Sequence, residues 1–173
     1  HRRKCTVCHD GVVSVLFSAE SVLRLSHDVQ SSAGNCTVSD LYLRSCRMAP
    51  TGKACLCKAC QCGRPHYEQR RVVAMPNVLF IQIVRSPGAI RVAVDVEELL
   101  ELPDLPPMEL LGVVYHFGLG VTSGHYTCAV RDVRGRCWFY ADDRPPVQVD
   151  VANARRKEVY LLAYCRRGGR ALW

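Results

Sequence analysis

Residues 123–127 read Ser-Gly-His-Tyr-Thr, and the adjacent carboxylates of Asp142 and Asp143 follow a short distance along the chain. Between them, residues 132–135 read Asp-Val-Arg-Gly, a turn signal that predicts a hairpin of two antiparallel strands. The hairpin would place His125 on one strand and a carboxylate on its neighbour. A base that removes a thiol proton and an acid that orients the base are two of the three members of a cysteine-protease triad.

The residues around His125 suit a site at the end of a strand. Gly124 permits close approach of the backbone at the mouth of a cleft, and Tyr126 continues the strand. Either Asp142 or Asp143 could accept the ring N–H of the histidine and fix its tautomer. A single histidine more often has a structural role in packing, so the catalytic interpretation depends on the pattern around it.

Cysteine pairs indicate a second site. The chain has 11 cysteines, an odd number, and no signal peptide, which argues against a secreted disulfide framework. Cys5-x-x-Cys8 and Cys57-x-x-Cys60 each form a knuckle that can direct two thiolates at one ion about 2.3 Å away, and two knuckles complete a structural zinc site. Four thiolates leave no open coordination position, so such a zinc ion would hold the structure together and take no part in chemistry.

The register of the second knuckle stays open at this point. Cys55 and Cys62 are interleaved with Cys57 and Cys60, so the pair 55 and 57 or the pair 60 and 62 could bind instead. Free buried thiols are the alternative to a metal. His66 is close to the knuckle in sequence and is expected at the surface.

Composition narrows the class of protein. With 49% hydrophobic and 23% charged residues among 173, the chain is globular and can bury a core. No apolar run is long enough to cross a bilayer, since the longest, at residues 78–84, is interrupted by Gln82. The formal charge of +7 comes from basic residues scattered along the chain with few interleaved aromatics, so nucleic-acid binding is not expected. We expect a soluble protein of the cytosol or nucleus, without a membrane partner.

Two parts follow from the distribution of cysteines and apolar residues. Residues 1–71 hold eight of the cysteines and little continuous apolar sequence, whereas residues 72–173 consist mainly of strands. Strands are expected at residues 11–17, 21–25, 78–84, 110–117, 126–130, 137–140 and 159–164. A short helix capped by Thr37, a turn at residues 49–52 and one helical turn within residues 96–102 are also expected.

Several motifs occur in the order found in one known family. They are the strand at residues 76–85, the strand at 111–118, the histidine box at 124–127, Trp138 followed by Asp142 and Asp143, and the closing strand at 159–164. On these motifs the chain resembles the ubiquitin-specific proteases, papain-like deubiquitinases built from fingers, palm and thumb. The match extends over nearly all of this chain but over only the later half of that family's catalytic domain.

The resemblance implies an α+β fold, with mainly antiparallel β fingers and a zinc ribbon at residues 1–71 and a β-rich palm at residues 72–173. It implies cleavage of isopeptide or peptide bonds after the C-terminal glycine of ubiquitin. The implied site residues are His125 as catalytic base, Asp142 as its orienting acid, Asp143 as the adjacent acid, Gly124 and Tyr126 as substrate-binding residues, and Cys5, Cys8, Cys57 and Cys60 as ligands of structural zinc.

The resemblance also implies a missing component. The family's cysteine box is absent from this chain, and Gly34-Asn35-Cys36 is similar to it only in part. We therefore expect a fragment, inactive by itself, that works with the N-terminal thumb half of the same domain on ubiquitin or ubiquitinated proteins. The alternative is a non-catalytic ubiquitin-binding or scaffold protein that lacks the nucleophile. A palm without its thumb exposes an apolar face, so partial instability or self-association is expected.

Overall fold

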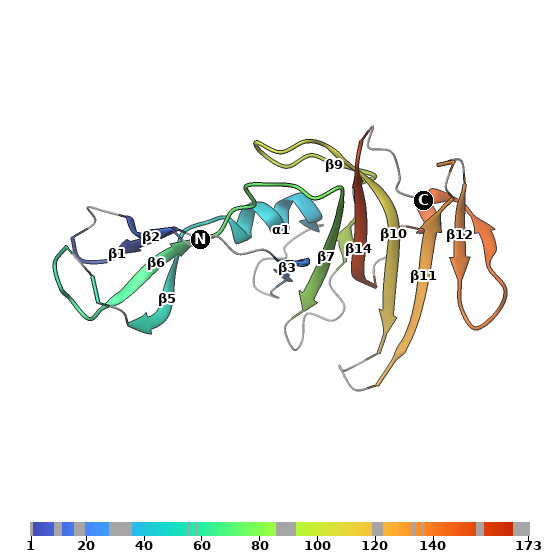
Figure 1. Cartoon of the computed structure of the whole chain (residues 1–173). Helices are drawn as coiled ribbons and strands as arrows, with labels where there is room; N and C mark the ends of the chain where they lie inside the picture. The colour runs from blue at the N-terminus through green and yellow to red at the C-terminus, as the bar shows by residue number, and fades with distance from the viewer. Residues whose placement is uncertain are drawn as a thin grey trace. The chain divides into compact units, whose positions relative to one another are not determined.

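The computed structural model describes residues 2–8, 12–15, 20–27, 36–54, 56–57, 59–85, 93–118, 123–132, 134–135, 137–154 and 158–167. The chain forms two compact units (Figure 1). Unit 1 comprises His1–Glu20 and Leu43–Val73, and unit 2 comprises Ser21–Tyr42 and Ala74–Trp173. Among the described residues the regular structure is mostly β-sheet with two short helices, as the α+β expectation requires.

Unit 1 is built on a four-stranded antiparallel sheet in the order β2-β1-β6-β5. Its strands are β1 (Arg2–Cys5), β2 (Val12–Val15), β5 (Ala49–Ala54) and β6 (Pro65–Gln69). The turn predicted at residues 49–52 is wrong. This segment belongs to β5, because Ala49 pairs with Glu68 and Pro50 with Tyr67 on the neighbouring strand.

Unit 2 contains an eight-stranded sheet in the order β13-β12-β11-β10-β14-β7-β3, with β9 paired to β10 beside this path. Its strands are β3 (Val22–His27), β7 (Val78–Arg85), β9 (Leu99–Leu100), β10 (Met108–Phe117), β11 (His125–Arg131), β12 (Trp138–Ala141), β13 (Val147–Val149) and β14 (Val159–Arg166). All neighbours pair antiparallel except β3 and β7, which are parallel. The strands predicted at residues 78–84, 110–117, 126–130, 137–140 and 159–164 are confirmed.

One face of this sheet forms the core of unit 2. The side chains of Ile81, Tyr115 and Leu162 are completely buried, and they lie on three neighbouring strands. The burial of β7 alternates along the strand, as expected where one face packs and the other does not. Tyr164 is also completely buried, and its hydroxyl donates a hydrogen bond of 2.9 Å to the backbone carbonyl of Glu97.

The helix predicted after Thr37 is confirmed as α1 (Val38–Ser45). Thr37 caps it, since the hydroxyl oxygen accepts the backbone N–H of Asp40 and the Asp40 carboxylate accepts the backbone N–H of Thr37, both at 3.0 Å. The carboxylate of Glu97 accepts the N–H groups of Val38 and Ser39. The N–H groups at the start of the helix are thereby satisfied. A second helix, α2 (Val151–Ala154), is one turn long.

The boundary between the two units differs from the one expected from the sequence, which divided the chain once, after residue 71. Residues 21–42 lie in the first part of the sequence but belong to unit 2. The physical reason is long-range pairing, because β3 adds in parallel to β7 and β4 (Cys36–Thr37) pairs with β8 (Val94–Asp95).

The helical turn predicted within residues 96–102 is wrong. Leu99 and Leu100 form β9, which pairs with the start of β10, and Leu100 is completely buried there. Among the described residues, the structure contains no helix whose length and hydropathy would let it cross a membrane.

Candidate functional site

The hairpin of β11 and β12 brings the predicted histidine and carboxylates together. Cys128 pairs with Ala141, so the register continued by one residue sets Asp142 opposite Thr127. His125 is two residues before Thr127, and side chains two apart on a strand share a face. His125 and Asp142 are therefore diagonal neighbours on one face of adjacent strands, which is within reach of long side chains.

The ring of His125 and the carboxylate of Asp142 are in direct contact. Nε2 of His125 lies 2.5 Å from Oδ1 of Asp142, and the two side chains are 46% and 38% exposed. The backbone N–H of Asp143 also donates to Oδ1 of Asp142, at 2.7 Å. This backbone hydrogen bond, followed by the ring of His125, holds the pKa of the Asp142 carboxyl below its ordinary value. The acid is therefore an anion that can hold Nε2–H and leave Nδ1 to accept a proton.

Asp143 is close to His125 and Asp142, but it contacts Asp142 through its backbone. Its carboxylate, that of Asp142 and the ring nitrogens of His125 offer ligand atoms within 4.8 Å of one another, all on exposed residues. The contact with Asp142 that has hydrogen-bonding geometry comes from the Asp143 backbone and not from its side chain. The structure thus distinguishes two carboxylates that the sequence pattern treats alike.

Gly124 is required by the close approach of β10. A Cβ atom at this position would collide with Nε2 of His116 and would lie 2.9 Å from the backbone oxygen of Phe117. Phe117 pairs with His125, so the glycine allows the two strands to stay in register up to the candidate base. The sequence pattern indicated a glycine at a close approach, but only the structure identifies what approaches it.

Tyr126 and His116 form an aromatic stack behind the candidate base. Their rings are 4.4 Å apart and nearly parallel, and Tyr160 meets the ring of Tyr126 edge-on at 5.6 Å. Tyr126 is 51% exposed, so one face of its ring remains available to a ligand. His116 thus supports the residues on both sides of His125.

The described residues place no thiol in hydrogen-bonding contact with His125. Cys36, the residue most similar in setting to a family nucleophile, is 1% exposed on β4, and its thiol faces the backbone oxygen of Thr37 at 3.6 Å. Cys128 belongs to β11 itself, on the face opposite to that of His125.

The four predicted metal ligands form a cluster in unit 1. The sulfur atoms of Cys5, Cys8, Cys57 and Cys60 all lie within 4.8 Å of one another. The separations of 3.6 Å between Cys5 and Cys60 and of 3.8 Å between Cys8 and Cys57 match the edge of a tetrahedron of thiolates, about 3.8 Å for bonds of about 2.3 Å. The donor set and its spacing fit a structural zinc ion.

Backbone N–H groups near the Cys5 sulfur favour its deprotonated form, which is the form that binds a metal. The backbone N–H groups of Cys8 and Val7 interact with the Cys5 sulfur and lower the pKa of that thiol to about 5. The surface position predicted for His66 is wrong, because it pairs with Cys5 across the sheet and is completely buried. Cys55, one of the alternative ligands, lies outside the described residues.

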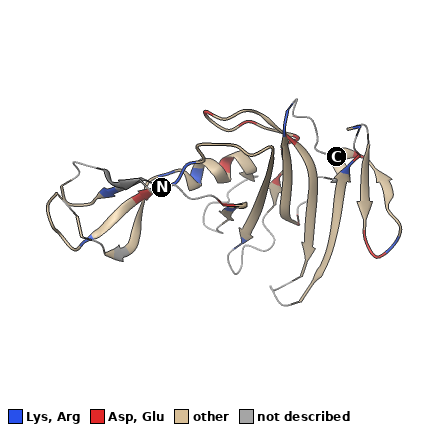
Figure 2. Cartoon of the chain, viewed as in Figure 1, with Lys and Arg blue, Asp and Glu red and all other residues tan. Residues whose placement is uncertain are grey.

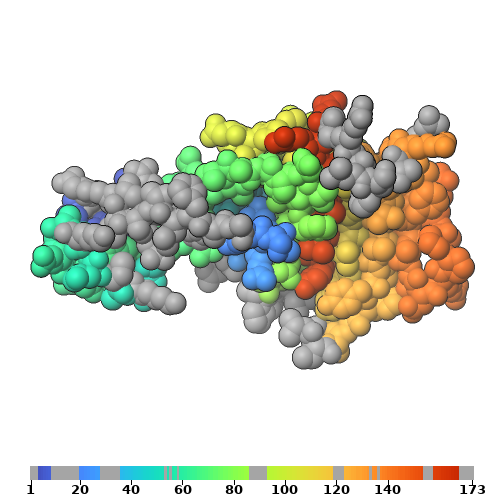
Figure 3. Space-filling view, viewed as in Figure 1, coloured from blue at the N-terminus to red at the C-terminus, as the bar shows by residue number. Residues whose placement is uncertain are grey.

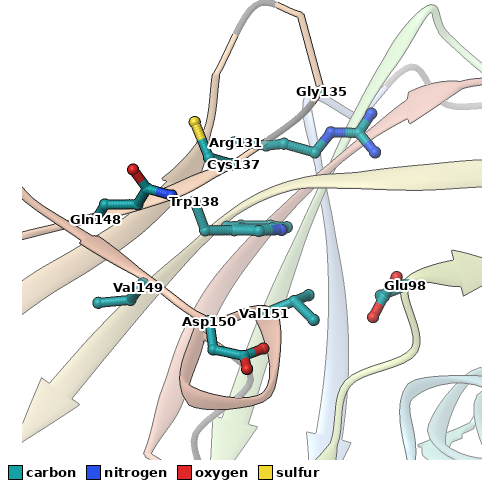
Figure 4. A pocket seen from close by; sticks show the side chains of 9 residues that line it. All are labelled: Glu98, Arg131, Gly135, Cys137, Trp138, Gln148, Val149, Asp150 and Val151. Carbon is teal, nitrogen blue, oxygen red and sulfur yellow. The ribbon is translucent and has the colours of Figure 1, made fainter.

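A separate pocket of about 360 Å³ lies at the other end of the β11–β12 hairpin (Figure 4). Arg131, which ends β11, and Trp138, which begins β12, line it together with Glu98 and Asp150. Arg131 is committed to an ion pair with Glu109 at 3.0 Å, and the Asp150 carboxylate accepts the N–H of Ala152. The ion pair of Arg131 with Glu109 lies at the turn end of the hairpin. His125 and Asp142 do not line this pocket.

Charge does not gather in one place on the described residues. Lys and Arg lie at separate points on several elements of both units (Figure 2). This distribution agrees with the basic residues scattered along the sequence.

Comparison with known proteins identifies the family. The pattern of the family described as "Ubiquitin carboxyl-terminal hydrolase" matches residues 8–164. Ubiquitin carboxyl-terminal hydrolase 4 of Saccharomyces cerevisiae is 26% identical over 198 residues, covering 95% of this chain and 21% of that protein. Ubiquitin carboxyl-terminal hydrolase 17-like protein B of Mus musculus is 28% identical over 164 residues, covering 88% of this chain and 32% of that protein.

Solved structures agree with this result at the level of the fold. The yeast SAGA DUB module with a mutant Sgf73 contains a chain that matches with a TM-score of 0.78 at 19% identity, covering 96% of this chain and 39% of that one. The SAGA Ubp8/Sgf11/Sus1/Sgf73 DUB module bound to ubiquitin aldehyde gives a TM-score of 0.75 at 18% identity, covering 96% of this chain and 40% of that one.

The chain thus combines a histidine–carboxylate pair on a β-rich unit with a four-cysteine cluster on the other unit. The chain belongs to the ubiquitin carboxyl-terminal hydrolase family, as the match over residues 8–164 shows. It spans about a fifth to a third of the length of these two curated relatives. The family resemblance deduced from the sequence motifs is confirmed.

Proposed function

We propose that this chain is the later part of the catalytic domain of a cysteine deubiquitinase that cleaves after the C-terminal glycine of ubiquitin. The observation that carries the proposal is the contact of 2.5 Å between Nε2 of His125 and Oδ1 of Asp142. It joins a base and an acid in the arrangement that a cysteine hydrolase uses.

His125 serves as general base and then as general acid. With Nε2–H donated to Asp142, Nδ1 accepts the proton of a cysteine thiol, and the thiolate attacks the carbonyl carbon of the scissile bond. The imidazolium then gives its proton to the leaving lysine amine as the carbon–nitrogen bond breaks. A water molecule, deprotonated by the same ring, hydrolyses the resulting thioester and releases the ubiquitin carboxylate. The cysteine belongs to the thumb half of the domain, outside this chain.

Asp142 orients the ring and stabilises its charged form. Its low pKa keeps it anionic while His125 changes protonation, so it does not take the proton itself. Asp143 contributes first through its backbone N–H, which fixes the orientation of the Asp142 carboxylate. Its own carboxylate belongs to an exposed residue beside the pair and is available to hold a water molecule or a neighbouring loop.

Gly124 and Tyr126 form the substrate-binding surface next to the base. A glycine carries no side chain into the path of a ligand, and the half-exposed Tyr126 ring, on the face of β11 opposite to that of His125, would offer an apolar surface beside that path. Such a path suits the Gly-Gly tail of ubiquitin, which has no side chains of its own.

The four cysteines hold zinc in a structural role. Cys5, Cys8, Cys57 and Cys60 would bind the ion, which would supply the cross-link between the two knuckles. The metal-supported sheet of unit 1 presents a rigid surface to the globular part of ubiquitin.

The test measures turnover of a fluorogenic ubiquitin substrate by the full-length protein that contains this chain, here called the intact parent. Replacing His125 by alanine should lower kcat/KM by at least about 100-fold, since a positioned general base contributes roughly that much. Asp142→Asn should also lower it, because an amide cannot stabilise the imidazolium as a carboxylate does. Asp104→Asn is the matched control, since Asp104 is an exposed aspartate whose positive φ of 62° an asparagine tolerates.

Two outcomes would contradict the assignment. Unchanged turnover by the His125→Ala protein would remove the base from the mechanism. A parent that binds ubiquitin but never hydrolyses the substrate would support the non-catalytic ubiquitin-binding alternative instead.

A further inference from the structure

A fifth thiol lies against the four-cysteine cluster. The sulfur of Cys62 is 3.4 Å from that of Cys5 and 3.3 Å from that of Cys60. These separations are as short as those among the four cysteines themselves, where Cys5 and Cys60 are 3.6 Å apart. A zinc ion binds four thiolates in a closed tetrahedron. Five cysteines therefore compete for four positions.

The turn after the second knuckle explains how Cys62 comes back to the cluster. The N–H of Gln61 donates to the backbone oxygen of Cys57 at 2.8 Å, and the N–H of Cys57 donates to the oxygen of Cys62 at 3.1 Å. Gln61 has a φ of 55°, the left-handed conformation that reverses the chain between the two cysteines. Residues 57–62 thus form one closed turn that carries three of the five thiols.

Burial shows which ligand is replaceable. Cys5 and Cys57 are 1% and 2% exposed, so neither can leave the cluster without opening unit 1. Cys60 is exposed, and it is in direct contact with Cys62. The Cys62 side chain is half-buried, and its sulfur also lies 3.4 Å from that of Cys5. Cys60 and Cys62 therefore both lie next to the buried Cys5, where either could bind the ion.

We infer that the fourth position of the zinc site is shared by Cys60 and Cys62, either of which completes the tetrahedron while the other stays free at the surface. The inference rests on the structural zinc site of the proposed function and adds a residue to it. The four sulfur atoms within 4.8 Å of one another include that of Cys60 and not that of Cys62, so exchange requires the turn to bring the Cys62 sulfur closer to the other ligands. The site then keeps its metal when one of these two thiols is lost.

The experiment compares single and double substitutions in the intact protein. Zinc content is measured by elemental mass spectrometry after gel filtration, and affinity by competition with a chelating dye. Cys60→Ser and Cys62→Ser should each retain one zinc per chain with an affinity within about tenfold of the parent. The double variant should lose more than about 100-fold, because even residues that only support a metal ligand cost 10–100-fold. Cys46→Ser, a cysteine of unit 1 outside the cluster, is the matched control.

A second measurement needs no substitution and so does not depend on a variant folding. The zinc-loaded parent is treated with iodoacetamide, and the label is located by peptide fragmentation. Labelled chains should carry one label within the cluster, on Cys60 in some and on Cys62 in others, and native mass spectrometry should show that they keep their zinc. Label on Cys62 alone, or loss of zinc from Cys60→Ser equal to that of the double variant, would overturn the inference. If the unsubstituted protein binds no zinc, both the zinc site and the shared fourth position are wrong. If it binds zinc but the substitution or labelling results fail, only the shared fourth position is wrong.

Discussion

At the scale of single residues, the candidate site depends on one glycine as much as on its charged groups. His125 and Asp142 meet because adjacent strands hold them as diagonal neighbours, and β10 can stay beside β11 at that point because Gly124 has no side chain. The ring of His116 fills the space where a Cβ would be and stacks on Tyr126. The candidate base is therefore positioned by residues that would take no part in the proposed proton transfer.

This arrangement predicts the effect of Gly124→Ala in the intact parent. The added methyl group must displace the His116 ring or the Phe117 backbone, which moves His125 relative to Asp142. We expect a loss of about 10- to 100-fold in kcat/KM, since displacement of a catalytic group by about 1 Å has effects of that size. Thermal unfolding should also shift to lower temperature.

Gly52→Ala is the control for that variant. A Cβ at Gly52 meets nothing within 4 Å, so the same chemical change should leave turnover and melting temperature unaltered. Equal behaviour of the two glycine variants would show that the space at Gly124 is not important for the site.

At the scale of elements, unit 1 differs from unit 2 in what it buries. The described residues of unit 1 that are fully buried are Cys5, Cys57 and His66, whereas unit 2 buries rows of aliphatic and aromatic side chains on β7, β10 and β14. Burial of so little apolar surface cannot offset the entropy of ordering four strands. We expect the proposed zinc ion to supply, through its cross-link, what the core of unit 1 lacks.

Removal of zinc should therefore unfold unit 1 selectively. After treatment with a chelator, hydrogen exchange followed by mass spectrometry should show loss of protection in β1, β5 and β6, while β10 and β14 keep theirs. Cys8→Ser, which removes one of the cluster's cysteines, should give the same pattern without a chelator. Full protection of β1 and β6 in protein shown to be free of zinc would contradict the structural role.

At the scale of the whole molecule, the sheet of unit 2 has an apolar face that no other described element covers completely. The strands β7, β14, β10 and β11 lie side by side (Figure 3). By their pairings, Phe80, Val84, Tyr126 and Val130 point to the face opposite the core, and they are between 40% and 51% exposed. Contiguous apolar surface of this kind favours association.

We expect the isolated chain to self-associate through this face. Light scattering coupled to gel filtration should show species larger than a monomer, and the double variant Phe80→Thr/Val130→Thr should shift them toward the monomer. Threonine keeps the strand propensity of both positions while removing apolar area. Val147→Thr changes an exposed valine on β13 and serves as control. If the isolated chain without substitutions stays monomeric at high concentration, the prediction is wrong.

The sequence by itself determined most strands of the eight-stranded sheet, although not β9 and β13. It also determined the hairpin, the helix after Thr37, the two CxxC knuckles and the residue types of a candidate base and its acid. These features are local, because they follow from periodicity along a strand, from turn residues and from short spacings. It failed where a segment has a distant partner. Residues 49–52 look like a turn until β6 is beside them, and His66 looks polar and exposed until Cys5 lies across the sheet.

Only the tertiary structure decided which side chain faces Gly124 and that residues 21–42 belong with the second unit, and it showed the contact of His125 with Asp142 that the family resemblance implied. It also showed that the sulfur of Cys62 lies 3.4 Å from that of Cys5 and 3.3 Å from that of Cys60. Each of these facts depends on how segments that are apart in the chain are placed against one another. Between paired strands, a shift of one residue turns every side chain to the other face, and strands that are far apart in the sequence have no short connecting turn to set that register.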